Sequence, residues 1–256
     1  MTRSNFLRNA ALGLLATGVL AACGGDGGAG GDTWTVGTEP AFPPFESVGE
    51  GDELVGFDID LMNAIGEKAG KTVSFDSLPF DSLIPALQTG SIDAAISGMT
   101  ITEERQATVD FSDPYFDAGL AIAVAEGNTD IKTLEDLEGK KIAAQIGTTG
   151  ASTAESVADA TVTTFDSAPL ALQELANGNV DAVVNDAPAT LDAIKTGNIP
   201  GIEVVGELLT EESYGIALPK GSENAEAINT ALAEIRADGT YAEIYEKWFG
   251  TQPPAE

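Results

Sequence analysis

Apolar residues along this chain alternate between short continuous runs and a spacing of three to four residues. The short runs predict strands, and the wider spacing predicts amphipathic helices. Strands are expected at residues 33–36, 72–78, 92–97, 141–144, 161–165 and 181–185, and helices at residues 59–69, 80–88, 149–159 and 167–177. This alternation predicts an α/β fold.

Local signals refine these limits. Asp58 directly precedes the helix expected over residues 59–69 and could cap it. Three prolines interrupt regular structure and predict a shaped loop over residues 39–46. The tail, residues 224–249, predicts two helices that break at Asp238-Gly239, with Trp248 and Phe249 in the core.

One pattern occurs twice. Residues 83–97 and residues 170–185 each combine an amphipathic helix, a glycine turn and a strand that opens with Asp-Ala. The repetition suggests two similarly built lobes, although a helix, a glycine and a strand follow one another in many α/β proteins.

The first residues have the pattern of an export signal. Residues 1–9 carry Arg3 and Arg8 without an acid, and residues 10–22 are apolar but too few to span a bilayer. The following Leu20-Ala21-Ala22-Cys23 has the form of a bacterial lipobox. We expect residues 1–23 to be a lipoprotein signal peptide and lipobox, although a plain signal peptide is the alternative. Residues 24–32 are then a glycine-rich tether, and a lipid on Cys23 anchors the exported protein to the cell membrane, in the periplasm or on the outer surface.

Charge and composition exclude several functions. The chain has 12 Lys and Arg against 41 Asp and Glu, a net charge of -29, which does not suit nucleic-acid binding. It has no histidine, and its single cysteine is Cys23, so histidine bases and intrachain disulfides are excluded. We therefore expect no metal and no cofactor.

In such an acidic chain, an anion needs a local, bidentate cation. Arg105 follows Gly98-x-Thr100 and the helix start Thr102-x-x-Arg105, where backbone N–H groups also point outward. Arg105 is therefore a candidate anion site; the alternative is a solvated surface arginine.

Several ordered motifs closely resemble the polar amino-acid-binding proteins of bacterial ABC importers, the extracellular solute-binding proteins of family 3. The motifs are Gly56-Phe57-Asp58-Ile59-Asp60-Leu61, Pro85-Ala86-Leu87, Ile92-Asp93-Ala94, residues 100–105, Asp110-Phe111-Ser112 and Asp238-Gly239-Thr240-Tyr241. Residues 241–250 look particularly like the glutamine-binding branch, and the resemblance covers residues 34–251.

The resemblance implies the two-lobed periplasmic-binding-protein type II fold with two hinge strands. The crossings are expected near residues 118–121 and 214–217, although both segments could be ordinary strand starts. Lobe 1 would then comprise residues 33–118 and 215–253, and lobe 2 residues 119–214.

The resemblance also implies a binding site for an amino acid. Arg105 matches the arginine that grips the ligand α-carboxylate, and Thr149 matches a helix-start position that also meets it. Thr100 and the Gly98 backbone, beside Ser97, match groups that bind the α-carboxylate and the α-amine. Asp186 matches the acid that pairs with the α-ammonium from the other lobe; taken alone, it would be a helix cap.

The ligand side chain is expected among four further residues. Phe42 and Phe80 match aromatic residues that sandwich it in relatives, although either could be core. Glu39 matches a position that is usually aspartate, and Gln145 departs from the lysine of the glutamine binders. A carboxylate beside aromatic faces suits a cation, so arginine is favoured and glutamine comes next.

The resemblance therefore predicts a monomeric substrate-binding lipoprotein that delivers a polar or basic L-amino acid to an ABC permease in the membrane. It predicts no enzymatic activity. The alternatives are a cyclohexadienyl dehydratase-like enzyme and a ligand-sensing domain on the same fold.

Overall fold

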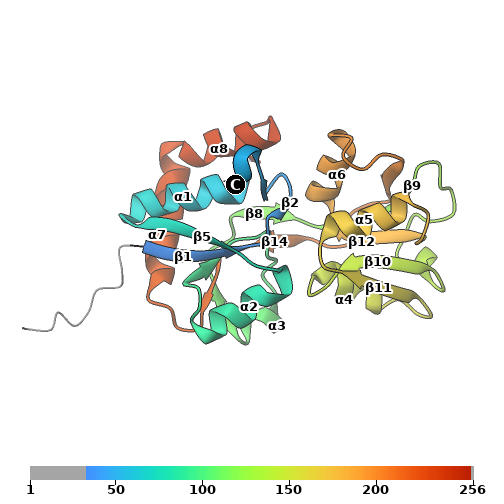
Figure 1. The fold of residues 1–256 in the computed structure, drawn as a ribbon, viewed down its shortest axis with the longest axis horizontal. Helices are drawn as coiled ribbons and strands as arrows, with labels where there is room; N and C mark the ends of the chain where they lie inside the picture. The colour runs from blue at the N-terminus through green and yellow to red at the C-terminus, as the bar shows by residue number, and fades with distance from the viewer. Residues whose placement is uncertain (1–32, 255–256) are drawn as a thin grey trace, which may run out of the picture. The chain divides into compact units, whose positions relative to one another are not determined.

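The computed structural model describes residues 33–254, which contain two five-stranded mixed sheets (Figure 1). The expected leader, Cys23 and the tether lie outside the described residues. The first sheet has the order β5-β1-β6-β15-β7, with bounds Thr72–Ser77, Thr33–Thr38, Ala94–Ala95, Ala217–Pro219 and Val109–Phe111. The second sheet has the order β11-β10-β12-β9-β13, with bounds Thr161–Phe165, Lys141–Gln145, Ala182–Asp186, Leu120–Ala125 and Ile202–Val205.

The two sheets share one pairing scheme. In the first sheet β1 pairs parallel with β5 and β6, and β15 pairs antiparallel with β6 and β7. In the second sheet β10 pairs parallel with β11 and β12, and β9 pairs antiparallel with β12 and β13. The repeated sequence pattern therefore corresponds to a repeated sheet arrangement.

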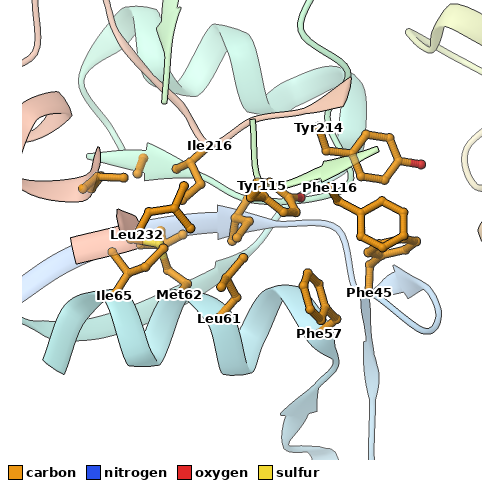
Figure 2. Packing of buried hydrophobic residues seen from close by; sticks show 14 of the residues in the cluster. Phe45, Phe57, Leu61, Met62, Ile65, Tyr115, Phe116, Tyr214, Ile216 and Leu232 are labelled. Atoms are coloured by element: carbon orange, nitrogen blue, oxygen red, sulfur yellow. The ribbon is translucent and has the colours of Figure 1, made fainter. Parts of the chain in front are cut away.

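Helices cover both faces of the first sheet (Figure 1). Helices α1 (Phe57–Ala69), α7 (Asn224–Asp238) and α8 (Thr240–Phe249) pack together on one face, and α2 (Phe80–Thr89) contacts the other. The core under α1 is rich in aromatic rings, with Phe45 edge-on to Phe116 at 4.9 Å between ring centroids (Figure 2). Trp248 and Phe249 pack against this core while they stay half-buried.

The second sheet has an aliphatic core on both faces. Along β9, Leu120, Ile122 and Val124 point into one cluster, which includes Ala154 of α4 (Thr149–Glu155). Ala123 points into the opposite cluster, which includes side chains of α5 (Ala168–Ala176) and α6 (Ala187–Lys195). Successive side chains of a strand point to opposite faces of the sheet. Alternate residues of β9 therefore pack against α4 on one face and against α5 and α6 on the other.

Two short segments connect the sheets. The chain leaves the first sheet through β8 (Phe116–Ala118) and returns through β14 (Glu212–Tyr214), which pairs antiparallel with β8. Near the start of the chain, β2 (Ala41–Phe42), β3 (Glu46–Val48) and β4 (Leu54–Val55) form a small antiparallel sheet. The loop expected over residues 39–46 therefore contains a short strand and the start of a second.

The structure corrects three local expectations. Asp58 lies inside the first turn of α1, where its side chain makes no capping bond, because it is buried and hydrogen-bonded elsewhere. The strand expected over residues 92–97 is regular only at Ala94–Ala95, and α4 ends at Glu155 instead of residue 159. Within residues 33–254, no helix is long and apolar enough to cross a membrane.

Candidate functional site

The carboxyl ends of four strands meet at one small pocket, the usual place for a ligand in an open α/β sheet. Glu39 follows β1, Ser97 follows β6, Gln145 ends β10 and Asp186 ends β12. The pocket is lined by all ten residues of the predicted site and by Thr148: Glu39, Phe42, Phe80, Ser97, Gly98, Thr100, Arg105, Gln145, Thr148, Thr149 and Asp186.

Arg105 is held at the pocket by a short helix. Thr102 caps α3 (Glu103–Gln106) by accepting a hydrogen bond from Arg105 N at 3.2 Å. The guanidinium donates from Nη1 to Thr100 O at 2.7 Å and from Nη2 to Gly147 O at 3.0 Å, and lies 5.4 Å from the centroid of the Phe80 ring. Burial lowers the pKa of Arg105, which the carboxylates of Asp186, Glu212 and Glu104 partly offset. The side chain is therefore a fixed, partly desolvated cation, unlike a solvated surface arginine.

Glu39 is a buried acid in the wall of the same pocket. Its side chain accepts a hydrogen bond from Gln145 Nε2 at 3.0 Å, and the same Gln145 nitrogen lies 3.2 Å from Asp166 O. Burial raises the pKa of Glu39 to about 7, with a further increase from Asp81 and a decrease from the Gln145 bond. A cation beside Glu39 would favour its ionised form.

Asp186 occupies the N-cap position of α6, but its carboxylate makes no capping bond. Its Oδ1 instead accepts a hydrogen bond from the Tyr214 hydroxyl at 2.6 Å. Burial raises the pKa of Asp186 to about 7, and the Tyr214 bond and the charge of Arg105 act in the opposite direction. The carboxylate thus lines the pocket and does not cap the start of the helix.

The floor of the pocket is formed by Ser97 and Gly98. Ser97 Oγ accepts a hydrogen bond from Glu39 N at 3.0 Å and donates to Glu46 at 2.8 Å. Gly98 has φ of 52°, and a Cβ there would approach the Phe42 ring to 2.8 Å. Glycine therefore allows the backbone to turn directly beneath an aromatic side chain.

The two aromatic residues differ in their surroundings. Phe42 is 6% exposed, belongs to the first-sheet core and stacks on Phe45 at 5.8 Å between ring centroids. Phe80 is half-buried at the start of α2, below the Arg105 guanidinium. Both rings line the pocket. Phe42 is therefore both a core residue and part of the pocket wall, which the sequence had posed as alternatives.

Three further residues at this site were not predicted from the sequence. Thr148, which lines the pocket, caps α4 by accepting from Ala151 N at 3.1 Å. Glu212 Oε2 accepts from Thr100 Oγ1 at 2.6 Å and from Thr149 Oγ1 at 3.0 Å. Glu212 and Tyr214 both lie on β14. Tyr214 is the first residue of the expected return crossing and Glu212 lies two residues before it, which is the one sequence signal that could have indicated them.

The charges of the pocket suit a small molecule with several charged groups. Arg105 supplies a cation with five N–H donors, whereas Glu39 and Asp186 supply carboxylates. Among residues 33–254, no group of three metal-ligating side chains is present. The arrangement can bind and orient a molecule that carries both an anionic and a cationic group.

Two mixed sheets whose strand ends face one small charged pocket define a protein of the periplasmic-binding-protein class. Residues 34–251 match the bacterial extracellular solute-binding proteins, family 3, and the chain belongs to this family. The resemblance noted from the sequence motifs is therefore confirmed.

Known relatives agree with this assignment. The chain is 39% identical over 220 residues to the ABC transporter arginine-binding protein 1 of Escherichia coli (strain K12), covering 83% of this chain and 89% of the relative. A solved ancestral arginine-binding protein bound to arginine is 53% identical, with a TM-score of 0.82, over 86% of this chain and 99% of that one. A structure of an ancestral arginine-binding protein bound to glutamine is 52% identical, with a TM-score of 0.80 and the same coverage. These relatives are binding proteins, which confirms the expectation of a binding protein over an enzyme.

Proposed function

We propose that this chain is the substrate-binding lipoprotein of an ABC amino-acid importer, with arginine as its preferred ligand and glutamine next. The observation that carries the proposal is the placement of Arg105, Asp186 and Glu39 around one pocket. An L-amino acid with a cationic side chain has a complementary charge for each of the three. Two relatives are named as arginine-binding proteins, and one of them was solved with arginine bound, which supports the same choice.

The α-carboxylate is placed at Arg105. Two guanidinium hydrogen bonds go to backbone carbonyls, which leaves further N–H groups for a ligand. The hydroxyls of Thr100 and Thr149 flank the same end of the pocket. The α-ammonium is placed at Asp186, whose carboxylate is oriented by Tyr214.

The ligand side chain is placed at Glu39, between the walls formed by Phe42 and Phe80. A guanidinium can bond to the Glu39 carboxylate and stack on an aromatic face. The side-chain amide of a glutamine ligand can donate a hydrogen bond to the same carboxylate, although the amide is uncharged. Gln145 already donates to Glu39, so a neutral amide is compatible with this end of the pocket.

Binding in this arrangement would connect the two sheets. Arg105 lies beside the first sheet and Asp186 ends a strand of the second, so one zwitterion contacts both. We propose that residues 33–118 with 215–253, and residues 119–214, act as lobes that close on the ligand at the segments near 118–121 and 214–217. Domain closure of this kind is a common response to a ligand that contacts both halves.

The test is calorimetric titration of a protein that begins near residue 32, freed of co-purified ligand by unfolding and refolding, against all twenty amino acids. Tight binding of arginine, with weaker binding of glutamine, supports the proposal. Binding of glutamine alone would overturn the choice of arginine, and no binding of any amino acid would overturn the function.

The anchor and the state of assembly belong to the proposal as well. We expect radiolabelled palmitate to be incorporated into the full chain in bacteria, and the substitution Cys23→Ser to abolish the label. An unlabelled wild-type chain would contradict lipid anchoring.

Light scattering of the protein that begins near residue 32 is expected to give the mass of a monomer.

A further inference from the structure

Two buried carboxyl groups, those of Glu46 and Asp58, are neighbours behind Ser97 and Gly98: Asp58 N donates to the carbonyl of Phe45, the residue before Glu46, at 2.9 Å. Glu46 is on β3 and Asp58 is in the first turn of α1, and both are 0% exposed. They are not among the residues that line the pocket. Buried acids of this kind are rare unless they are paired with a partner.

Both carboxyl groups hold the residues above them. Glu46 Oε1 accepts a hydrogen bond from Ser97 Oγ at 2.8 Å. Asp58 Oδ2 accepts from Gly98 N at 2.9 Å and from the Tyr115 hydroxyl at 2.7 Å. The position of the floor therefore depends on oxygen atoms from these two acids.

The remaining oxygen of each acid has no donor among the described residues. Glu46 Oε2 and Asp58 Oδ1 are fully buried and accept no hydrogen bond from an N–H or O–H group of the protein. Two carboxylates cannot satisfy one another, because an ionised carboxylate only accepts. One proton between the two groups supplies the missing donor and removes one of two buried charges.

We propose that Glu46 and Asp58 share one proton at neutral pH and that this pair positions Ser97 and Gly98 in the pocket floor. Asp58 carries the charge, because two other donors already stabilise its carboxylate, and Glu46 carries the proton. The effect on ligand binding rests on the function proposed above, whereas the shared proton itself does not.

The surroundings favour this protonation state. Burial is the largest cause that raises the pKa of Glu46 well above its usual range, and the charge of Asp58 raises it further. Burial also raises the pKa of Asp58, which its hydrogen bonds with Gly98, Tyr115 and Glu46 lower. The other ionisable groups that bear on the pair within the described chain are acids: Glu39, Tyr115 and Tyr214.

Two substitutions of similar size separate the shared proton from simple packing. In Glu46→Gln, the amide N–H replaces the shared proton, so arginine affinity should stay within about twofold of the wild type. In Glu46→Met, Ser97 Oγ and Asp58 Oδ1 lose their partner, so affinity should fall about tenfold or more. Glu50→Gln, at an exposed position near the same small sheet, is the matched control and should bind as the wild type does.

Infrared spectroscopy tests the proton without a ligand. At neutral pH, the difference spectrum of wild type minus Glu46→Gln should contain the carbonyl stretch of a carboxylic acid, and wild type minus Glu50→Gln should lack that band. Relative to Glu46→Gln, the wild type should also lose unfolding free energy as pH rises above the usual pKa of glutamate. The sign follows because the folded state holds the proton more tightly than the unfolded chain.

The outcomes are distinct. A carboxylic-acid band that depends on Glu46, with Glu46→Gln binding normally and Glu46→Met weakly, supports the proposal. Absence of that band, or equal loss of affinity in both variants, overturns it. A wild type that shows the band but binds no amino acid overturns the proposed function and leaves the shared proton supported.

Discussion

The two sheets differ in how the pocket residues beside them are held. On the side of the first sheet, called the anchored side below, Ser97 and Gly98 are hydrogen-bonded to acids behind them. On the side of the second sheet, called the facing side below, Gln145 and Asp186 are hydrogen-bonded to residues outside that sheet. Ser97 and Gly98 are held by Glu46 and Asp58, which are deeply buried in the same region. Gln145 of the second sheet instead donates to Glu39 of the first. Asp186 accepts from Tyr214 of the connecting strand β14.

This difference has a consequence for recognition. Ser97 and Gly98 can keep their geometry whether or not a ligand is present, because the two acids that hold them lie in the same region. Arg105 differs, because it also donates to Gly147 O beside the second sheet. On the facing side, Gln145 bonds to Glu39 across the pocket and also to Asp166 O of its own region. A ligand that satisfies both sides would stabilise the closed arrangement, and the loss of a side chain should reveal which side supplies the affinity.

The largest expected effect is at Arg105, which bonds to Thr100 O beside the first sheet and to Gly147 O beside the second. Arg105→Ala removes the cation for the ligand carboxylate and should weaken arginine binding by roughly 2–5 kcal/mol, the usual loss when a buried charge loses its partner. Titration calorimetry measures the loss. Arg236→Ala, whose side chain donates to Pro114 O in another part of the first-sheet region, is the control and should bind normally. Near-normal affinity of Arg105→Ala would refute the site.

The next effect is on the facing side. Asp186→Asn keeps an oxygen for the Tyr214 hydroxyl but removes the charge that pairs with the α-ammonium. We expect a loss of roughly 2 kcal/mol for arginine and for glutamine alike, because both share this group. Asp192→Asn, on the same helix but outside the pocket, should have no effect. A loss confined to one ligand would place Asp186 at the side-chain end instead.

Glu39→Gln should separate ligands by charge. Arginine binding should weaken about tenfold or more, because the guanidinium loses a charged partner, whereas glutamine binding should change much less. The two titrations on one variant control for any general damage to the pocket. Equal losses for both ligands would contradict the assignment of Glu39 to the side chain.

The pH dependence should sharpen the same distinction. Glu39 and Asp186 both have a pKa of about 7, so each is partly protonated near neutral pH. A cationic ligand favours the ionised forms, so arginine affinity should rise as pH increases toward about 8 and then level off. Glutamine requires only Asp186 to be ionised, so its affinity should rise less steeply.

Calorimetry in buffers of different ionisation enthalpy should show proton release on binding below about pH 7. An equal dependence of affinity on pH for arginine and glutamine would contradict the role of Glu39.

The smallest effect is expected at a hydroxyl of the facing side. Thr149→Val removes a hydroxyl that lines the pocket, donates to Glu212 and belongs to the end proposed for the ligand carboxylate. We expect a loss of about 1 kcal/mol, typical of one hydrogen bond. Ser152→Ala, one turn along the same helix and exposed, is the control. Unchanged affinity in both variants would remove Thr149 from the ligand contacts.

The sequence predicted the layout of this protein well because its signals are local. Hydrophobic spacing located most helices and strands, and the repeated helix–glycine–strand pattern corresponds to two sheets with one pairing scheme. The ten residues predicted for the site do line one pocket, and the resemblance to the family supplied that set. The roles of these residues toward a ligand stay predictions.

Other features depended on distant contacts. Asp58 has the spacing of a helix cap, yet its carboxylate bonds to Gly98, which lies forty residues further along the chain. Glu46 follows a proline-rich loop and carries no signal of burial. Glu212 joins Thr100 and Thr149, a contact that exists only because the two sheets are folded side by side.

The sequence by itself determined the α/β class, the family and the charged residues available to a ligand, because periodicity and motifs are properties of neighbouring residues. The tertiary structure alone decided which acids are buried, which donors satisfy them and how far their pKa values move from their usual ranges. Desolvation and hydrogen bonding set those properties, and both depend on atoms that are brought together from distant parts of the chain.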